Sequence, residues 1–242
     1  MSRQEAIVGI LGGMGPDATV DLMRRIVAMT PASDDQDHVR LLVDHNPKVP
    51  SRIKALIDKT GESPAPVLIG MAQGLERGGA SVLAMPCNTA HAYRGEIQAS
   101  VGIPLLDMIA LTAERIAGMQ PKCTSVGMLA STAVHTVGLY ERALKPFGIA
   151  TIYPENQDAV MGIIKAVKRG DTGAEQRQAL KSAAENLRGR SADLLLIACT
   201  ELSVLADCLA DFAHCTDRRL PVLDALDVLA EKIVACGEAS HG

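Results

Sequence analysis

Short apolar runs alternate with amphipathic segments along the chain, and this alternation predicts an α/β fold built on parallel strands. Several runs, such as DLLLIA at 193–198, are almost wholly apolar, which is typical of strands buried on both faces of a sheet. The apolar runs predict strands at 6–11, 39–44, 81–85, 103–106, 125–129, 150–153, 193–198 and 220–223. Helical periodicity predicts helices at about 17–29, 64–77, 90–99, 108–118, 136–146, 156–169, 174–189 and 225–236. Polar segments at 30–37 and 59–66 are predicted to be surface loops.

The same pattern occurs twice, and the two copies are offset by about 117 residues. The clearest match is a strand-like run, an aspartate and an amphipathic helix. The matching pairs are 103–117 with 220–234, 8–13 with 126–131, 19–25 with 136–142, and 82–90 with 194–202. We therefore predict two pseudo-symmetric α/β domains with parallel sheets and the active site in the cleft between them. The predicted halves are 1–117 and 118–224, and the C-terminal helix, 225–242, can pack back on the first half.

In each half, one predicted strand ends at a cysteine that small polar residues follow. Cys87 precedes Asn88 and Thr89, and Cys199 precedes Thr200. The carboxyl ends of parallel strands are where open α/β sheets bind ligands, and a helix N-terminus favours a thiolate. Either cysteine alone would more simply be a buried packing residue. Matched positions in a repeat instead favour a shared chemical role.

Two opposed thiols can invert a carbon stereocentre. One thiolate removes a proton from carbon, the other thiol returns a proton to the opposite face, and neither step needs a metal or an organic cofactor. The polar residues Asn88, Thr89 and Thr200 can donate hydrogen bonds to a substrate carboxylate, helped by backbone N–H groups. The pattern thus predicts a racemase or epimerase that acts on an acidic C–H bond beside a carboxylate.

Composition limits the other classes of function. The chain has 242 residues, 48% of them hydrophobic, and a net charge of −4, which argues against a nucleic-acid partner. We see no apolar run of the roughly 18 residues that a membrane helix needs, and no signal peptide. The six cysteines form no CxxC pair, which argues against a structural zinc site. The chain is not a small, core-poor secreted protein that depends on disulfides, so we expect reduced thiols and a cytoplasmic protein. The cysteines expected to be packing or surface residues are Cys123, Cys208, Cys215 and Cys236.

Three motifs together resemble the aspartate/glutamate racemase family, and most closely its aspartate racemase branch. They are Gly12-Gly13-Met14-Gly15-Pro16, Pro86-Cys87-Asn88-Thr89-Ala90-His91 and Cys199-Thr200-Glu201. The resemblance covers essentially the whole chain. It implies a cofactor-independent homodimer of two-domain subunits in which Cys87 and Cys199 are the acid/base residues. Glu201 stands where the glutamate racemase branch typically has histidine.

The resemblance also implies which residues contact the substrate. Asn46-Pro47-Lys48-Val49-Pro50-Ser51-Arg52 resembles a family segment whose arginine binds the side-chain carboxylate, so Arg52 takes that role. Val167-Lys168-Arg169-Gly170 resembles a second segment and assigns Lys168 to the site, with Lys165 the less favoured alternative. The substrate-binding residues implied in this way are Met14, Arg52, Asn88, Thr89, Ala90, Ser131, Thr132, Lys168, Thr200 and Glu201.

Three departures from the family pattern leave the exact substrate open. Ser51 replaces a common aspartate, Ile53 follows Arg52 in place of threonine, and Val134 also stands where threonine is frequent. Aspartate is the favoured substrate, while glutamate or a broader range of amino acids remains an alternative. Arg52 and Lys168 read without the family could be surface charges only.

Other classes of protein remain as alternatives. Gly13 to Ala18 fits G-x-G-x-x-A, the fingerprint of a nucleotide-binding dehydrogenase, with Asp44 near the end of the next strand. A tight turn before a helix explains the same glycines, and we favour it because the dehydrogenase leaves the paired cysteines unexplained. A non-catalytic amino-acid-binding protein is a further alternative. His91, four residues after Cys87, has the spacing of a metal ligand, but we favour packing or support of the cysteine.

Overall fold

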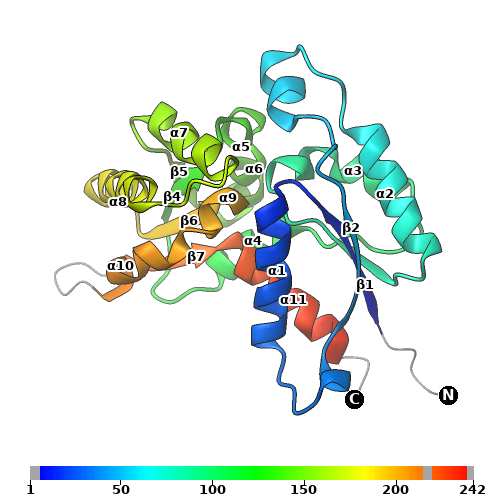
Figure 1. The fold of residues 1–242 in the computed structure, drawn as a ribbon. Helices are drawn as coiled ribbons and strands as arrows, with labels where there is room; N and C mark the ends of the chain where they lie inside the picture. The colour runs from blue at the N-terminus through cyan, green and yellow to red at the C-terminus, as the bar shows by residue number, and fades with distance from the viewer. Residues whose placement is uncertain (1–5, 215–219, 239–242) are drawn as a thin grey trace. The chain divides into compact units, whose positions relative to one another are not determined.

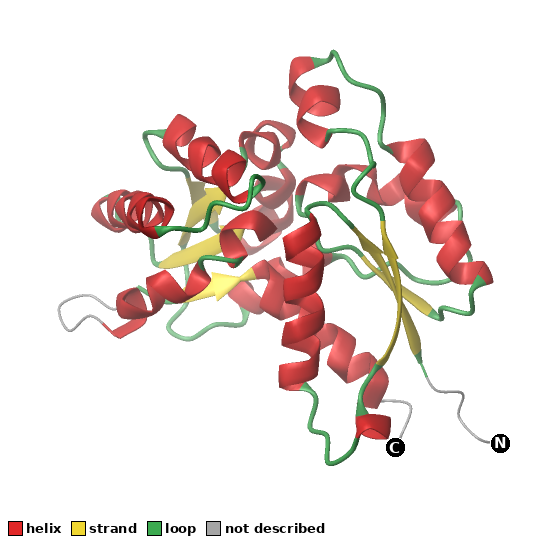
Figure 2. Cartoon of the chain, in the orientation of Figure 1, coloured by secondary structure: helices red, strands yellow, loops and turns green. Residues whose placement is uncertain are grey.

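The computed structural model describes residues 6–214 and 220–238. The chain divides into two compact units, each of which alternates parallel strands with helices (Figures 1 and 2). Unit 1 runs to Met108 and resumes at Leu226, and unit 2 comprises Ile109–Ala225. The predicted α/β class with two parallel-sheet domains is confirmed. No helix in the described part of the chain is long and apolar enough to cross a membrane.

Unit 1 contains a parallel sheet with strand order β2-β1-β3. The central strand β1 pairs with β2 from Ile7↔Arg40 to Gly12↔His45, and with β3 at Val8↔Val82. Almost all residues of β1 are buried, as expected for a strand covered on both faces, and this accounts for its continuous apolar sequence. The strands are β1 (Ile7–Gly12), β2 (Arg40–His45) and β3 (Val82–Ala84). The helices are α1 (Pro16–Met29), η1 (Asp35–Asp37), η2 (Lys54–Asp58), α2 (Ala65–Arg77), η3 (Thr89–Tyr93), α3 (Arg94–Ala99) and α11 (Ala225–Glu238), which joins this unit from Leu226.

The strand predicted at 103–106 is reduced to one bridge, Leu83↔Leu105, beside β3. Leu83 N–H donates to the Pro104 carbonyl at 2.8 Å, and Leu106 N–H donates to the Leu83 carbonyl at 2.8 Å. The segment therefore occupies the place of a fourth strand without forming a full one.

Unit 2 contains a parallel sheet with strand order β5-β4-β6-β7. Its strands are β4 (Ser125–Ala130), β5 (Ala150–Ile152), β6 (Leu194–Ala198) and β7 (Val222–Asp224). Its helices are α4 (Met108–Ala117), which belongs to it from Ile109, α5 (Thr132–Val137), α6 (Leu139–Leu144), η4 (Lys145–Phe147), α7 (Gln157–Val167), α8 (Ala174–Gly189), α9 (Thr200–Ser203), η5 (Ala206–Leu209) and α10 (Ala210–His214). With the bridge at Leu105 in the place of β7, the order in unit 1 is the same, as the repeat predicts.

The helix after the last strand of each repeat belongs to the other unit. Residues of α4 from Ile109 onward group with unit 2, and residues of α11 from Leu226 onward group with unit 1. The predicted boundary at 117 therefore lies at 108 in the structure. A helix belongs with the unit that covers its apolar side, and the sequence pattern shows where a helix ends but not which sheet it covers.

Two helix predictions also need correction. The helix predicted at 136–146 is two helices, α5 and α6, which Gly138 separates with a left-handed φ of 69°. A residue in this conformation ends a helix, and glycine adopts it without strain. The segment predicted as one helix at 90–99 begins as the 3₁₀ helix η3 and continues as α3.

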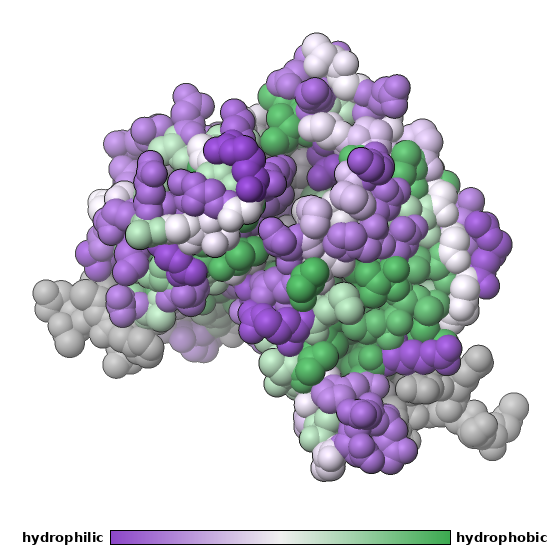
Figure 3. Space-filling model, viewed as in Figure 1, coloured by the Kyte–Doolittle hydropathy of each residue, from purple (hydrophilic) through white to green (hydrophobic). Residues whose placement is uncertain are grey.

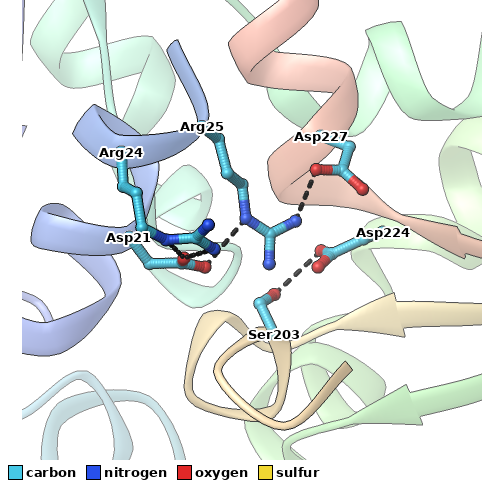
Figure 4. A network of polar contacts seen from close by, with 6 residues as sticks. All are labelled: Asp21, Arg24, Arg25, Ser203, Asp224 and Asp227. Carbon is cyan, nitrogen blue, oxygen red and sulfur yellow. Dashed lines mark hydrogen bonds and ion pairs between the residues drawn. The ribbon is translucent and has the colours of Figure 1, made fainter. Parts of the chain in front are cut away.

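A buried arginine joins α1 to α11 within unit 1. Arg25, which is 8% exposed, donates from Nε to Asp21 at 2.8 Å and from Nη1 to Asp227 at 2.5 Å (Figure 4). Burial of an arginine is favourable only when carboxylates compensate its charge, as these two do. The contact thus connects the C-terminal helix, which groups with unit 1, to the first helix of the chain.

Candidate active site

In unit 1, the loops after the three strands meet at the carboxyl edge of the sheet. Met14 follows β1, Val49 lies in the loop after β2, and Cys87 and Ala90 follow β3, and all four lie in one buried cluster. Gly13 has a φ of 89°, and a Cβ there would lie 2.3 Å from the carbonyl carbon of Asn46. Glycine is therefore required where the first loop touches the second.

The glycine loop forms a closed turn before α1. Gly13 N–H donates to Thr19 Oγ1 at 2.8 Å, and the Thr19 hydroxyl donates to the Gly15 carbonyl at 3.2 Å. A dinucleotide site uses the backbone N–H groups of such a loop for phosphate. Here the Gly13 N–H is already bound by the Thr19 hydroxyl of α1. This supports the interpretation of Gly13 to Ala18 as a turn.

Cys87 lies in a tight turn between β3 and η3. Its side chain is buried, and its backbone N–H donates to the Met85 carbonyl at 2.8 Å. Asn88 and Thr89 follow it and are also buried. The structure thus brings the predicted residues Met14, Cys87, Asn88, Thr89 and Ala90 together at one edge of unit 1.

His91 contacts the Cys87 turn with one ring nitrogen and the start of α4 with the other. Met108 N–H donates to Nε2 at 3.2 Å, so Nε2 carries no proton. Nδ1 therefore carries the proton and donates to the Cys87 carbonyl at 2.9 Å. Burial lowers the pKa of His91, which is consistent with this neutral form. Both nitrogens are occupied, so the metal-ligand alternative has no support here.

Arg52 lies near the Cys87 segment, in the loop after β2. Its Nη1 donates to the carbonyls of Val49 at 3.2 Å and Pro50 at 2.9 Å. Its Nε is buried and has no hydrogen-bond partner among the described residues. Burial and the charge of Glu96 raise the pKa of the Tyr93 phenol in η3, and the positive charge of Arg52 partly opposes that rise. An unsatisfied buried donor on a cation is suited to an anionic ligand.

In unit 2, Cys199 follows β6 and begins the short helix α9. Its buried Sγ donates to Glu201 Oε2 at 3.1 Å, and Lys168 Nζ lies 3.3 Å from Glu201 Oε1. Burial raises the pKa of Cys199 well above its usual value, and the Glu201 carboxylate raises it further, while Lys168 partly opposes both. Cys199 is therefore held as a protonated thiol beside a carboxylate.

Ser131 and Thr132 follow β4, the strand next to β6. The register Ala130↔Ala198 places Ser131 and Cys199 at the same edge of the sheet. Ser131 Oγ accepts Val134 N–H at 3.4 Å and thus caps α5, and Thr132 N–H donates to Met161 Sδ at 3.3 Å. Val134, one of the three departures from the family pattern, is fully buried.

The sequence did not identify Ser203 or Tyr93. Ser203 is four residues after Cys199, as His91 is four residues after Cys87, and its hydroxyl donates to Asp224 Oδ1 at 2.8 Å. The repeat already matches Asp224 with Asp107. Alignment of the residues that follow the two cysteines would therefore have identified Ser203 from the sequence. Of the cysteines expected to be packing residues, Cys123 and Cys208 are buried, Cys236 is half-buried and Cys215 lies outside the described residues.

Fold and site together define a duplicated α/β protein in which each unit holds a buried cysteine at the carboxyl edge of its parallel sheet, Cys87 in unit 1 and Cys199 in unit 2. Residues 11–233 match the family model described as Asp/Glu/Hydantoin racemase. The chain belongs to this family, as the motifs predict.

Individual relatives agree with this assignment. The chain is 28% identical over 234 residues to the broad specificity amino-acid racemase RacX of Bacillus subtilis, covering 95% of this chain and 97% of that protein. The structure of an aspartate racemase from Picrophilus torridus is 33% identical, with a TM-score of 0.84, covering 96% of this chain and 94% of that chain. A glutamate racemase from Bacillus anthracis shares the fold at 14% identity, with a TM-score of 0.70. The match covers 98% of this chain and 83% of that chain.

Proposed function

We propose that this protein inverts the α-carbon of an acidic amino acid, with aspartate the favoured substrate, by a cofactor-independent mechanism that uses Cys87 and Cys199. The observation that carries the proposal is the matched pair of buried cysteines, one after β3 and one after β6. The family assignment supports the reaction class, and the Picrophilus torridus aspartate racemase supports the substrate.

The reaction moves one proton in each direction. With Cys87 as thiolate, its sulfur takes the α-proton, and the C–H electron pair moves into the substrate carboxylate. The Cys199 thiol then gives its proton to the opposite face, and the electron pair returns to the α-carbon. The sulfur atoms have exchanged protonation states at the end. The mechanism requires that both thiols reach one α-carbon, which a short reagent that links two thiols would test.

Glu201 has a defined part in this cycle. Its carboxylate lies 3.1 Å from Cys199 Sγ and can accept the thiol proton when the reverse reaction needs a Cys199 thiolate. Lys168 holds the other carboxylate oxygen at 3.3 Å and counters the negative charge. We therefore propose that Glu201 and Lys168 act on the sulfur, although the resemblance implied that they contact the substrate.

Substrate recognition is assigned to Arg52 and the residues after Cys87. The buried Nε of Arg52 suits a side-chain carboxylate, while Asn88, Thr89 and Thr200 hold the α-carboxylate and the ammonium group. A second candidate is racemisation of a broader set of amino acids. Ser51 and Ile53 beside Arg52 and the relative named as broad specificity favour it.

Isotope exchange in heavy water tests the reaction class without any added cofactor. Purified protein is given each enantiomer of aspartate, glutamate and a panel of neutral amino acids, and α-deuterium is followed by NMR. We expect exchange and inversion with aspartate, and loss of inversion in Cys87→Ser and Cys199→Ser. Absence of exchange with every amino acid would refute the racemase, and full activity in both variants would refute the two-thiol mechanism.

Two simple outcomes belong to the other protein classes. Tight binding of one enantiomer without turnover would indicate an amino-acid-binding protein. A rise in melting temperature on addition of a dinucleotide would indicate a nucleotide-binding dehydrogenase. Neither outcome is expected from the racemase proposed here.

We further propose that the protein is a homodimer, as the family resemblance implies. An apolar row on α1 gives one surface for the contact, because Val20, Met23 and Val27 are 61%, 37% and 55% exposed. Figure 3 shows hydrophobic surface over α1 and beside it within unit 1. Analytical ultracentrifugation should give a dimer for the wild type and a monomer for Val20→Glu/Val27→Glu. A monomeric wild type would contradict the proposal.

We assign the reaction to the cytoplasm because acid/base thiols must stay reduced. Five cysteines within the described residues are free thiols. Fractionation of cells that produce the native chain would test this location, and activity confined to an extracytoplasmic fraction would contradict it.

A further inference from the structure

The residue four positions after each cysteine forms a matched contact in the two units. In unit 1, His91 donates to the Cys87 carbonyl and accepts Met108 N–H at 3.2 Å. In unit 2, Ser203 N–H donates to the Cys199 carbonyl at 3.3 Å, and the Ser203 hydroxyl donates to Asp224 at 2.8 Å (Figure 4). His91 thus joins its cysteine turn to the first residue of α4, and Ser203 joins its cysteine turn to the last residue of β7.

These segments are the two points at which the chain passes between units. The chain leaves unit 1 after Met108 and leaves unit 2 after Ala225, which directly follows Asp224. In the repeat, Asp224 matches Asp107, the residue before Met108. His91 and Ser203 therefore bind neighbouring positions of the repeat, since Met108 matches Ala225, the residue after Asp224. A ring nitrogen makes one contact and a hydroxyl makes the other.

We infer that His91 and Ser203 are a matched pair of positioning residues, each of which fixes the thiol of its own unit by anchoring the cysteine turn beside the point where the chain passes to the other unit, at Met108 and at Asp224. This inference rests on the proposed two-thiol function. It assigns each positioning residue to one face of the substrate: His91 serves the Cys87 step, and Ser203 serves the Cys199 step.

The surroundings of both residues favour a fixed geometry. His91 is 5% exposed and Ser203 is 3% exposed, so water does not replace a lost contact cheaply. The charged groups that act on His91 are Asp107 and Arg94, and they form an ion pair with each other at 3.1 Å. The Ser203 hydroxyl donates to a carboxylate, which makes a stronger hydrogen bond than a neutral acceptor.

The test measures α-proton exchange separately for the two enantiomers in heavy water. Cys87→Ser and Cys199→Ser first establish which enantiomer each thiol deprotonates. His91→Leu removes both ring contacts, and Ser203→Ala removes the hydroxyl. His91→Asn is the conservative variant, because its amide can donate to the Cys87 carbonyl. The matched controls are His38→Leu and Ser182→Ala. His38 is the C-cap residue of η1, and Ser182 lies on the exposed side of α8.

We expect His91→Leu to slow exchange of the Cys87 enantiomer by roughly 10- to 100-fold, because a small displacement of a reacting group costs that much. Exchange of the other enantiomer should change less than threefold. Ser203→Ala should show the reverse selectivity, and His91→Asn should recover part of the lost rate. Melting temperatures show whether each variant is folded, and the controls should exchange like the wild type.

Two results would overturn the inference. One is an equal loss for both enantiomers in folded His91→Leu and Ser203→Ala, and the other is wild-type exchange in both. If His91→Leu does not fold, His91→Asn must still be selective for the Cys87 enantiomer, and equal rates there would also overturn it. Failure of the proposed function is a separate result, because the wild type itself would then show no exchange.

Discussion

Cys199 Sγ lies 3.1 Å from Glu201 Oε2, and Lys168 Nζ lies 3.3 Å from the other oxygen of the same carboxylate. The thiol and the ammonium group thus contact the two oxygens of one carboxylate within unit 2. Burial and then the Glu201 carboxylate raise the pKa of Cys199 and keep the proton on sulfur, while the Lys168 ammonium group partly opposes them. The state of Cys199 between turnovers therefore depends on two residues that sequence resemblance assigned to the substrate.

The contacts among Cys199, Glu201 and Lys168 predict opposite effects for two substitutions. Glu201→Gln removes the negative charge, so the pKa of Cys199 should fall, while Lys168→Met removes the opposing positive charge, so it should rise. The measurement is the pH dependence of Cys199 alkylation, followed by mass spectrometry of the labelled peptide. Cys123 in the same sample is the internal reference. Shifts of the same sign would contradict the arrangement.

Arg52 should determine preference for an acidic side chain. Arg52→Leu removes the guanidinium, so kcat/KM for aspartate should fall roughly 10- to 150-fold, the cost of one hydrogen bond to a charged group. Arg52→Lys should restore little, because lysine cannot form two parallel hydrogen bonds to a carboxylate. Initial rates with aspartate and with a neutral amino acid of similar size provide the comparison. An equal loss for both substrates would show that Arg52 does not read the side chain.

Replacement by alanine should have opposite effects on stability at Gly13, in the loop after β1, and at Gly70, in α2. Gly13→Ala places a Cβ 2.3 Å from the Asn46 carbonyl carbon at a φ of 89°, so it should destabilise the fold by about 2–4 kcal/mol. Gly70→Ala, on the exposed side of α2 with nothing within 4 Å, should stabilise by about 0.5–1 kcal/mol. Thermal and urea unfolding measure both. Equal stability of the two variants would remove the argument that glycine is required at 13.

The sequence predicted the strands and the two cysteine turns because apolar runs and the repeat are local signals. It did not predict that the fourth strand of unit 1 is reduced to a bridge at Leu105, although the matched segment after Pro221 forms β7. It also did not predict that Gly138 divides a helix, since that break depends on a single residue within a continuous pattern. The domain boundary and the Lys168–Glu201 pair depend on which distant segments pack together. Periodicity carries no information on such contacts.

The neutral form of His91 predicts a pH dependence of stability. The unfolded chain binds a proton at His91 near pH 6.5, while burial lowers the folded-state pKa. As the pH falls below 6.5, the unfolded state binds more protons, so stability is lost until the folded-state pKa is passed, and it is fully present above 6.5. The melting temperature of the wild type should therefore fall more steeply between pH 7.5 and about 5 than that of His91→Asn, which cannot be protonated there. The control His38→Leu leaves both ring contacts of His91 in place and should therefore keep the wild-type slope. Parallel curves for the wild type and His91→Asn would contradict the buried neutral histidine.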